Sequence, residues 1–302
     1  MQKTISYFDI FDYPLTSLEI WKYLYLPDAG QTQSGAGPRP GSRAGLEEII
    51  SILNNPELNQ GIEFAQGFYF LRGRGAIVDV RKRRYLIAEP KLKKAKKYCR
   101  YLASLEGVLG IAVANTLALQ NSRLESDIDL FVISRAGQIW STRFWSVLPL
   151  YFIGGRPRGA DTRDKFCLSY FVDEDHLDIR PWKLEDDIYY VYWLATLLPL
   201  FGENIFEKFW QENQWVKKYL PNFLPPKSSP RLNVAPVANL PITRAENFLR
   251  FLQMRGMPRS LKDLAAGEGS EVVIRDGVLK FHPNDRRREY QNEFNQRINN
   301  LH

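Results

Sequence analysis

The chain has 302 residues, of which 44% are hydrophobic and 13% aromatic, and its formal net charge is +7. This composition excludes a disordered chain, and the length predicts two or three domains with a sizeable core. The two cysteines, Cys99 and Cys167, have no neighbour at a metal-ligand spacing, which predicts a reduced, cytoplasmic chain.

We expect neither a secretory signal nor a membrane span. The first fifteen residues interrupt their apolar run with acids, unlike a signal peptide. The apolar stretches 139–153 and 188–201 contain proline and are shorter than the roughly 20 residues that cross a bilayer. Both are therefore predicted to be buried.

Residues 1–78 predict a small domain in which helices precede a hairpin. Thr16-Ser17-Leu18-Glu19 is a capping box that opens a helix, and 27–45, rich in Gly, Ser and Pro, is expected to be a loop. Residues 62–64 and 68–71 flank a short turn and predict the hairpin. Three helices followed by a hairpin is the order of a winged-helix module.

The helix predicted over 46–54 would occupy the recognition position of such a module. It carries Glu47 and Glu48 but no Arg or Lys, which favours a structural or protein-contact role over base reading in the major groove. Arg72 and Arg74 on the hairpin leave phosphate contacts open.

The positive charge is concentrated between residues 81 and 100. Ten basic residues lie there against one acid, Glu89, so this window holds more than the whole net charge of the chain. Such a strip attracts phosphate backbones, and a nucleic acid is a candidate partner. The alternative is a solvated face of a helix, predicted over 91–105, that leads into the next strand.

Residues 107–133 read as a hydrophobic strand, a turn with a short helix, and a second hydrophobic strand that carries Asp127 and Asp129. Alternate side chains of a strand share a face, so the two carboxylates project together. Two carboxylates near a core repel unless a cation lies between them. Their hard oxygen ligands favour Mg²⁺ or Mn²⁺.

This stretch resembles the nucleotidyltransferase superfamily typified by DNA polymerase β. The signature of that family is a hydrophobic strand ending in Gly-Gly or Gly-Ser, a short spacer, and Asp-h-Asp with h hydrophobic. Ala114-Asn115 stands at the Gly-Ser position, residues 116–126 form the spacer, and Asp127-Ile128-Asp129 supplies the acidic pair. Ala114 and Asn115 depart from the family pattern, although Asn can still donate to phosphate oxygens.

The resemblance covers roughly 91–180 and implies transfer of NMP from an NTP, with ATP the expected donor, to a hydroxyl acceptor. Asp127 and Asp129 would hold the metal. A third catalytic carboxylate is expected on a later strand, where Leu177-Asp178-Ile179 is the match. The residues expected to contact the nucleotide phosphates are Ala114, Asn115, Arg123 and Ser126.

Two other functions remain open for the same residues. The departures at 114 and 115 are compatible with a catalytically inactive relative that binds a nucleotide or a partner. The N-terminal module and the basic strip are compatible with a winged-helix nucleic-acid-binding regulator. For Arg123, an ion pair with Glu125 is the alternative to a role in the site.

Residues 183–302 are predicted to be mostly helical, with helices over 185–198, 204–220 and 245–255 and a hairpin around Asp276-Gly277. The chain as a whole is therefore expected to be α+β. Its three parts are a winged-helix-like module (1–78), a mixed α/β nucleotidyltransferase core (79–182) and the helical C-terminal region (183–302).

Overall fold

The computed structural model of the chain describes residues 1–27, 44–55, 57–157, 159, 161–226, 231–267, 269 and 271–300. Helices and strands are mixed, so the predicted α+β class is confirmed. Most of the loop expected over 27–45 lies outside the described residues. Among the helices that are described, none combines the length and the apolar character that crossing a membrane requires.

The N-terminal module contains the predicted helices and hairpin. The capping box is confirmed, because the Thr16 hydroxyl accepts from the Glu19 N–H while the Glu19 carboxylate accepts from the Thr16 N–H. The hairpin pairs Ile62 with Leu71. The elements are α1 (Gln2–Asp9), α2 (Ser17–Lys22), α3 (Leu46–Leu53), β1 (Ile62–Ala65) and β2 (Phe68–Leu71).

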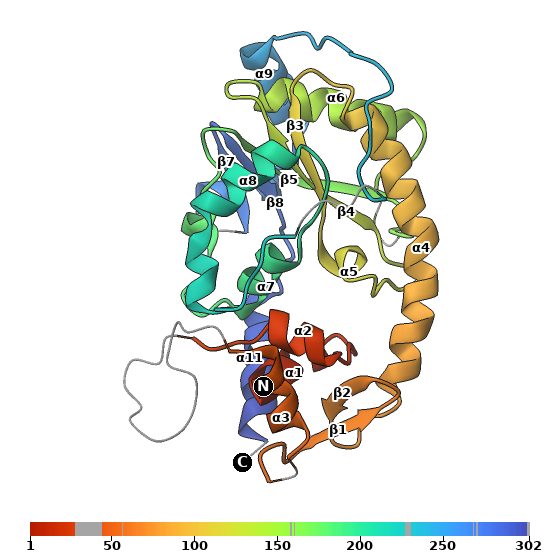
Figure 1. The fold of residues 1–302 in the computed structure, drawn as a ribbon. Helices are drawn as coiled ribbons and strands as arrows, with labels where there is room; N and C mark the ends of the chain where they lie inside the picture. The colour runs from red at the N-terminus through yellow and green to blue at the C-terminus, as the bar shows by residue number, and fades with distance from the viewer. Residues whose placement is uncertain are drawn as a thin grey trace.

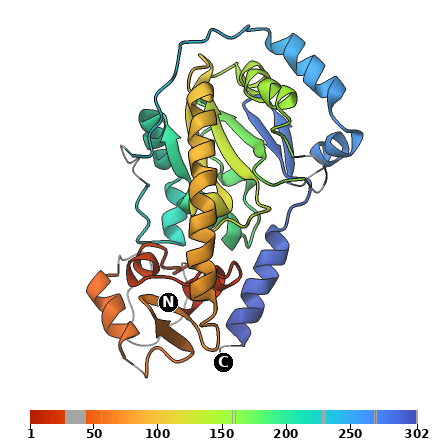
Figure 2. The same cartoon turned by 90° about the vertical axis from the view of Figure 1, so that its right-hand side faces the viewer.

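A single long helix, α4 (Ile77–Leu102), leads from this module along the sheet (Figure 2). The helix expected over 91–105 therefore begins fourteen residues earlier and ends three residues earlier. Its buried residues Ala88, Leu92, Ala95 and Cys99 recur every three or four positions, which places them on one face. That apolar face packs on the sheet and explains why the helix persists through the basic strip.

The second sheet has six strands in the order β6-β3-β4-β5-β8-β7. Only β4 and β5 run parallel, and every other neighbouring pair is antiparallel. The strands are β3 (Val108–Val113), β4 (Ile128–Ser134), β5 (Phe166–Asp173), β6 (Leu198–Phe201), β7 (Val272–Arg275) and β8 (Val278–Phe281).

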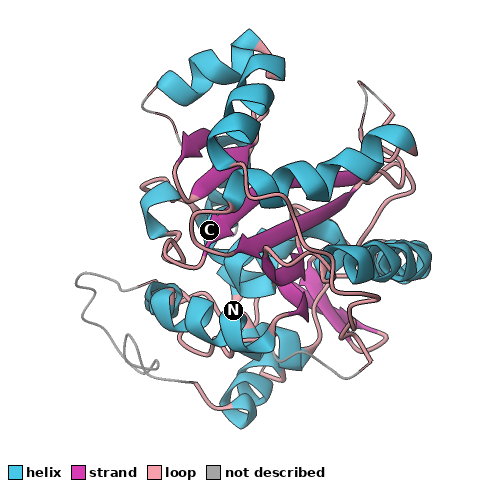
Figure 3. Cartoon of the chain, turned by 90° about the horizontal axis from the view of Figure 1, so that it is seen from above, coloured by secondary structure: helices cyan, strands magenta, loops and turns pink. Residues whose placement is uncertain are grey.

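Alternation along β4 divides the apolar residues between two cores. Ile128, Leu130 and Val132 pack with α4 and with α6 (Ile139–Phe152). Phe131 and Ile133 pack on the other face with α7 (Ile188–Thr196) and α8 (Glu203–Glu212). Seen from above, the strands run through the middle of the molecule with helices on either side (Figure 3).

The C-terminal region is less helical than expected. Leu198, predicted to end a helix, instead begins β6, which pairs with β3. The hairpin at Asp276-Gly277 is confirmed, but β8 also pairs with β5, so half of the strands in the sheet come from this region. The remaining elements are the 3₁₀ turns η1 (Arg180–Trp182) and η2 (Gln214–Lys218), and the helices α9 (Glu246–Gly256), α10 (Arg259–Ala266) and α11 (Arg287–Asn299).

The last helix returns to the first, so both ends of the chain lie at the same end of the molecule (Figure 1). Asp9 of α1 accepts from Arg297 of α11 at 3.0 Å and from Arg74 at 2.9 Å. Asp9 is buried and Arg297 is partly buried, which makes this pair stronger than an exposed one. The network ties the N-terminal module to the C-terminal helix.

Gly202, between β6 and α8, should tolerate alanine less well than Gly137. Both have positive φ (+86° and +65°), but a Cβ at Gly202 would lie 2.0 Å from the Leu109 carbonyl oxygen, whereas Gly137 faces open space. We expect Gly137→Ala to lower the free energy of unfolding by about 1 kcal/mol and Gly202→Ala by about 3 kcal/mol or more. Urea unfolding measures both, and equal losses would contradict this account.

Candidate metal centre

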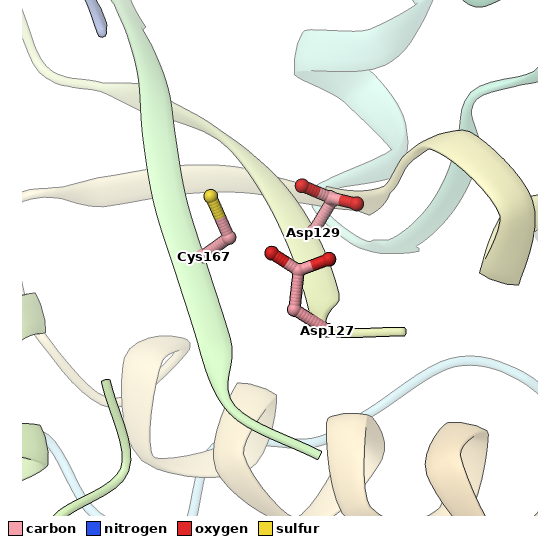
Figure 4. A group of neighbouring side chains, drawn as sticks. All are labelled: Asp127, Asp129 and Cys167. Carbon is pink, nitrogen blue, oxygen red and sulfur yellow. The ribbon is translucent and has the colours of Figure 1, made fainter. Parts of the chain in front are cut away.

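Asp127, Asp129 and Cys167 form the only group of potential metal ligands found in the described part of the chain. One ligand atom from each lies within 4.8 Å of the others. Asp127 directly precedes β4, Asp129 lies within it, and Cys167 is the residue opposite Asp129 on β5. Figure 4 shows the two carboxylates side by side with the thiol across from them. The predicted convergence of the aspartates is confirmed.

Burial and mutual repulsion make the ionised forms of Asp127 and Asp129 unfavourable unless a cation lies between them. Burial, followed by the neighbouring charge of Asp127, raises the pKa of Asp129 to about 7, although Asn115 and Cys167 donate to it. Burial also raises the pKa of Asp127, against the attraction of Lys91. A carboxylate raised in this way marks a candidate functional site.

The Asn115 side chain is positioned to donate a hydrogen bond to the Asp129 carboxylate. It begins the short helix α5 (Asn115–Ala118) with a left-handed φ of 56°, which Asn tolerates better than most residues. Its Oδ1 accepts from the Tyr189 hydroxyl at 2.9 Å, so the amide nitrogen is left for the carboxylate. The preceding residue, Ala114, donates its N–H to the Asp129 carbonyl at 3.0 Å.

Lys91 supports the pair from the side of α4. Its side chain is only 4% exposed and donates to the carbonyl oxygens of Leu124 and Ser126 and to the carboxylate of Asp164, at 2.7–3.0 Å. These contacts fix the turn that delivers Asp127 to β4. Within the sequence, Lys91 was one of ten cations in the basic strip, and nothing there separated it from the others.

The carboxylates open into a cavity of about 400 Å³, within the usual range for small-molecule sites. Three arginines, Arg84, Arg123 and Arg286, line it together with aromatic side chains. The aromatic residues come from three separate parts of the chain: Tyr7, Phe8, Phe11, Tyr189, Tyr192, Trp193 and Tyr290. Sequence reasoning missed them because only the fold brings positions 7 and 290 together.

Two further predicted residues, Arg123 and Ser126, also line this cavity. The Ser126 hydroxyl accepts from the backbone N–H of Arg123 at 3.0 Å, which closes the turn before Asp127. The alternative ion pair of Arg123 with Glu125 is not formed. Throughout the described ranges, no carboxylate lies within ion-pair distance of the Arg123 guanidinium.

Asp178 is not part of the site, which corrects the sequence expectation. It follows the end of β5, whereas Asp129 pairs with Cys167 at the beginning of that strand. Its carboxylate instead accepts from the Arg180 N–H at 2.9 Å and from the Arg180 guanidinium at 3.1 Å. Asp178 therefore caps a turn. The motif Leu177-Asp178-Ile179 alone does not show whether its aspartate lies at the beginning of β5, beside Asp129, or beyond the end of that strand.

No family model, curated protein or solved structure matches this chain.

The ligand set fits one hard cation. The two carboxylates suit Mg²⁺ or Mn²⁺, which bind through oxygen and retain open positions for water or phosphate. Burial and the nearby aspartates raise the pKa of the Cys167 thiol, so it remains protonated and is no ligand for a hard ion. The position where a third carboxylate could join the pair is thus occupied by a weak hydrogen-bond donor.

Several cations of the basic strip are committed to the fold. Arg81 pairs with Glu19 at 2.8 Å, Arg84 pairs with Asp12 at 2.8 Å, and Lys91 is buried. The charge available to a polyanion is correspondingly smaller than the sequence indicates. Nucleic-acid binding by this strip stays a prediction.

Lys91→Met should destabilise the protein far more than Lys93→Met on the same helix. The first change leaves Asp164 and two carbonyl oxygens without their buried cation, which costs about 3 kcal/mol of unfolding free energy. Lys93 is 74% exposed and pairs only with Glu89, so its loss should cost less than about 0.5 kcal/mol. Chemical denaturation tests the difference, and similar losses would show that Lys91 does not anchor the turn.

Asp129→Asn should stabilise the metal-free protein in a pH-dependent way. The folded-state pKa of about 7 lies above the unfolded value of about 3.9, so the wild type loses stability as pH rises between these values. Above pH 7 the variant should be more stable by on the order of 2 kcal/mol, and the gain should vanish below about pH 4. Unfolding curves at pH 4, 6 and 8 measure it. A gain that does not vary with pH would refute the assignment.

Proposed function

We propose that the chain is a metal-dependent nucleotidyltransferase that moves NMP from an NTP to a hydroxyl acceptor. One observation carries the proposal: the aspartate pair lines the same cavity as aromatic side chains and Arg123, an arginine that forms no ion pair with a described carboxylate. A magnesium–triphosphate complex presents a cation to the carboxylates and phosphate oxygens to the Arg123 guanidinium. It therefore matches both charges of the cavity at once.

The aromatic side chains supply surfaces for a nucleobase. Tyr189 and Tyr290 stack on each other with ring centroids 5.1 Å apart and planes at 20°, and the Arg286 guanidinium lies 4.9 Å from the Tyr290 ring, so the other rings of the cavity are the ones on which a base would stack. Both tyrosines also line an adjoining hollow of about 150 Å³, which extends the space beyond the carboxylates. Stacking on such rings is worth about 1–3 kcal/mol for each base.

In the proposed reaction, the acceptor oxygen attacks the α-phosphorus, the bond to the bridging oxygen breaks, and pyrophosphate leaves. The ion held by Asp127 and Asp129 would offset the charge that develops on the phosphate oxygens. The acceptor proton passes to water, because both aspartates hold the ion and the ligand cluster found among the described residues contains no third carboxylate. Arg123, which forms no ion pair with a described carboxylate, holds the leaving phosphates. An NTP substrate suits the cytoplasmic location expected from two unpaired cysteines.

Cys167 favours a second candidate function. Two-ion nucleotidyl transfer uses carboxylates that bridge both ions, and this thiol stands opposite Asp129 where a third carboxylate would complete such a site. A protein that binds the metal–nucleotide complex without transferring it would need only the two aspartates. Transfer and binding are therefore measured separately.

Asp127→Asn should weaken Mg²⁺-dependent ATP binding at least tenfold, because one of two anionic ligands to the ion is lost. Asp178→Asn is the matched control, since it removes an aspartate of the same domain that caps a turn outside the site. Calorimetric titration with and without Mg²⁺ measures both. An unchanged affinity in the Asp127 variant would overturn the metal assignment.

Transfer is tested with α-labelled NTPs and mixtures of hydroxyl acceptors. We expect label in an acceptor and release of pyrophosphate by the wild type, with loss of both in Asp129→Ala. ATP binding with no transfer to any acceptor would favour the second candidate. In that case Cys167→Asp, which restores a third carboxylate, would be the informative variant.

A further inference from the structure

A second and larger cavity, of about 650 Å³, lies between α6, β5 and the segment that joins α9 to α10. It borders the metal centre, because Cys167 lines it. Most of its wall is apolar and comes from α6, α9, α10 and the segment between the last two: Phe144, Val147, Leu148, Leu252, Met257 and Leu261.

Arg143 of α6 is the unusual residue of this wall. Its Nε atom is buried without a hydrogen-bond partner, and its guanidinium lies 4.6 Å from the Phe281 ring. Among the residues that the structure describes, the acceptor found for its guanidinium is the neutral Gln253 side-chain oxygen. Gln253 is fixed in that orientation because its Nε2 donates to the Trp140 and Leu249 carbonyls.

Within the described part of the chain, no carboxylate balances this charge. Among the described residues, no carboxylate forms an ion pair with Arg143 or with Arg156, which also lines the cavity. The Arg156 guanidinium instead donates a hydrogen bond of 3.0 Å to the Tyr151 hydroxyl oxygen. Burial, and then the charge of Arg156, lowers the pKa of Arg143 to about 10. A half-buried cation without an acid is costly unless an anion joins it.

We propose that this cavity binds an amphiphile with an alkyl chain and a single oxyanionic head group, which Arg143 and Arg156 hold. The apolar helix side chains contact the chain of the ligand, and the guanidinium pair supplies the charge. Ser169, which also lines the cavity, adds a hydroxyl to this lining. This site is separate from the nucleotide cavity and does not depend on the proposed transfer reaction.

The chemistry of the cavity selects this ligand class over others. A cation would be repelled, since both charged groups of the lining are positive. A fully polar anion would leave the apolar wall unfilled, whereas an alkyl chain gains about 0.8 kcal/mol for each buried CH₂ group. The exposed rim residues Tyr151 (57%) and Leu252 (43%) provide an apolar entrance.

Direct binding to the full chain tests the proposal, with decanoate and decyl phosphate as anionic probes and decanol and decyltrimethylammonium as matched controls. Calorimetry is performed below the micellar concentration of each. We expect at least one anion to bind, at least tenfold more tightly than decanol, with no binding of the cation. The stronger of the two anions identifies a carboxylate or a phosphate head. Equal affinity for decanoate, decyl phosphate and decanol, or no binding of any probe, would overturn the proposal.

Two variants locate the site. Arg143→Gln should weaken binding of the preferred anion at least tenfold, whereas Arg255→Gln, an exposed arginine of α9 outside the cavity, should not change it. Leu148→Trp replaces the leucine side chain with a larger indole ring. This ring would occupy part of the cavity, so the variant should reduce binding of every alkyl probe. Circular dichroism verifies that each variant is folded. Anion binding that survives both Arg143→Gln and Leu148→Trp would place the ligand elsewhere and refute the assignment.

Discussion

The carboxylates of Asp127 and Asp129 lie side by side at the beginning of β4. Their mutual repulsion is the constraint on which the site depends, and neighbouring side chains contact the pair or the turn before it. One neighbour, Lys91, fixes the turn before the strand with hydrogen bonds of 2.7 and 3.0 Å to backbone carbonyls. Another, Asn115, donates to Asp129 from the start of α5. These contacts do not neutralise the pair, since burial still raises the pKa of both acids. A bound cation would remove that cost.

Three parts of the chain must converge for such a site to become a cavity. The central strands carry the acids, the N-terminal module contributes Phe11, and α11 contributes Tyr290. The ion pair of Asp9 with Arg297 holds the first and last helices together, so the cavity depends on contacts between residues nearly the whole chain apart. The cavity that contains Arg143 lies across Cys167 from this site, and the two cavities carry different chemistry.

Local patterns predicted much of this structure. The alternation around Asp127 and Asp129 placed both on one face, and the capping box at Thr16 and the turn at Asp276-Gly277 were confirmed. Pairing between distant strands was not predictable, because β6 and β8 join the sheet through partners far away in sequence. For the same reason, Cys167 could not be recognised as the neighbour of Asp129, nor Asp178 excluded. Residue propensities determine local structure, whereas the pairing register between distant strands determines which side chains meet in a site.

The proposed chemistry requires that a divalent cation binds between the two aspartates. A crystal grown with Mn²⁺ and a non-hydrolysable ATP analogue, measured at a wavelength where manganese scatters anomalously, tests it most directly. We expect an anomalous peak about 2.1 Å from an oxygen of each carboxylate, bridged to the phosphates of the analogue. An anomalous map without a peak at the pair, with the carboxylates instead bound to arginine or to water, would contradict it.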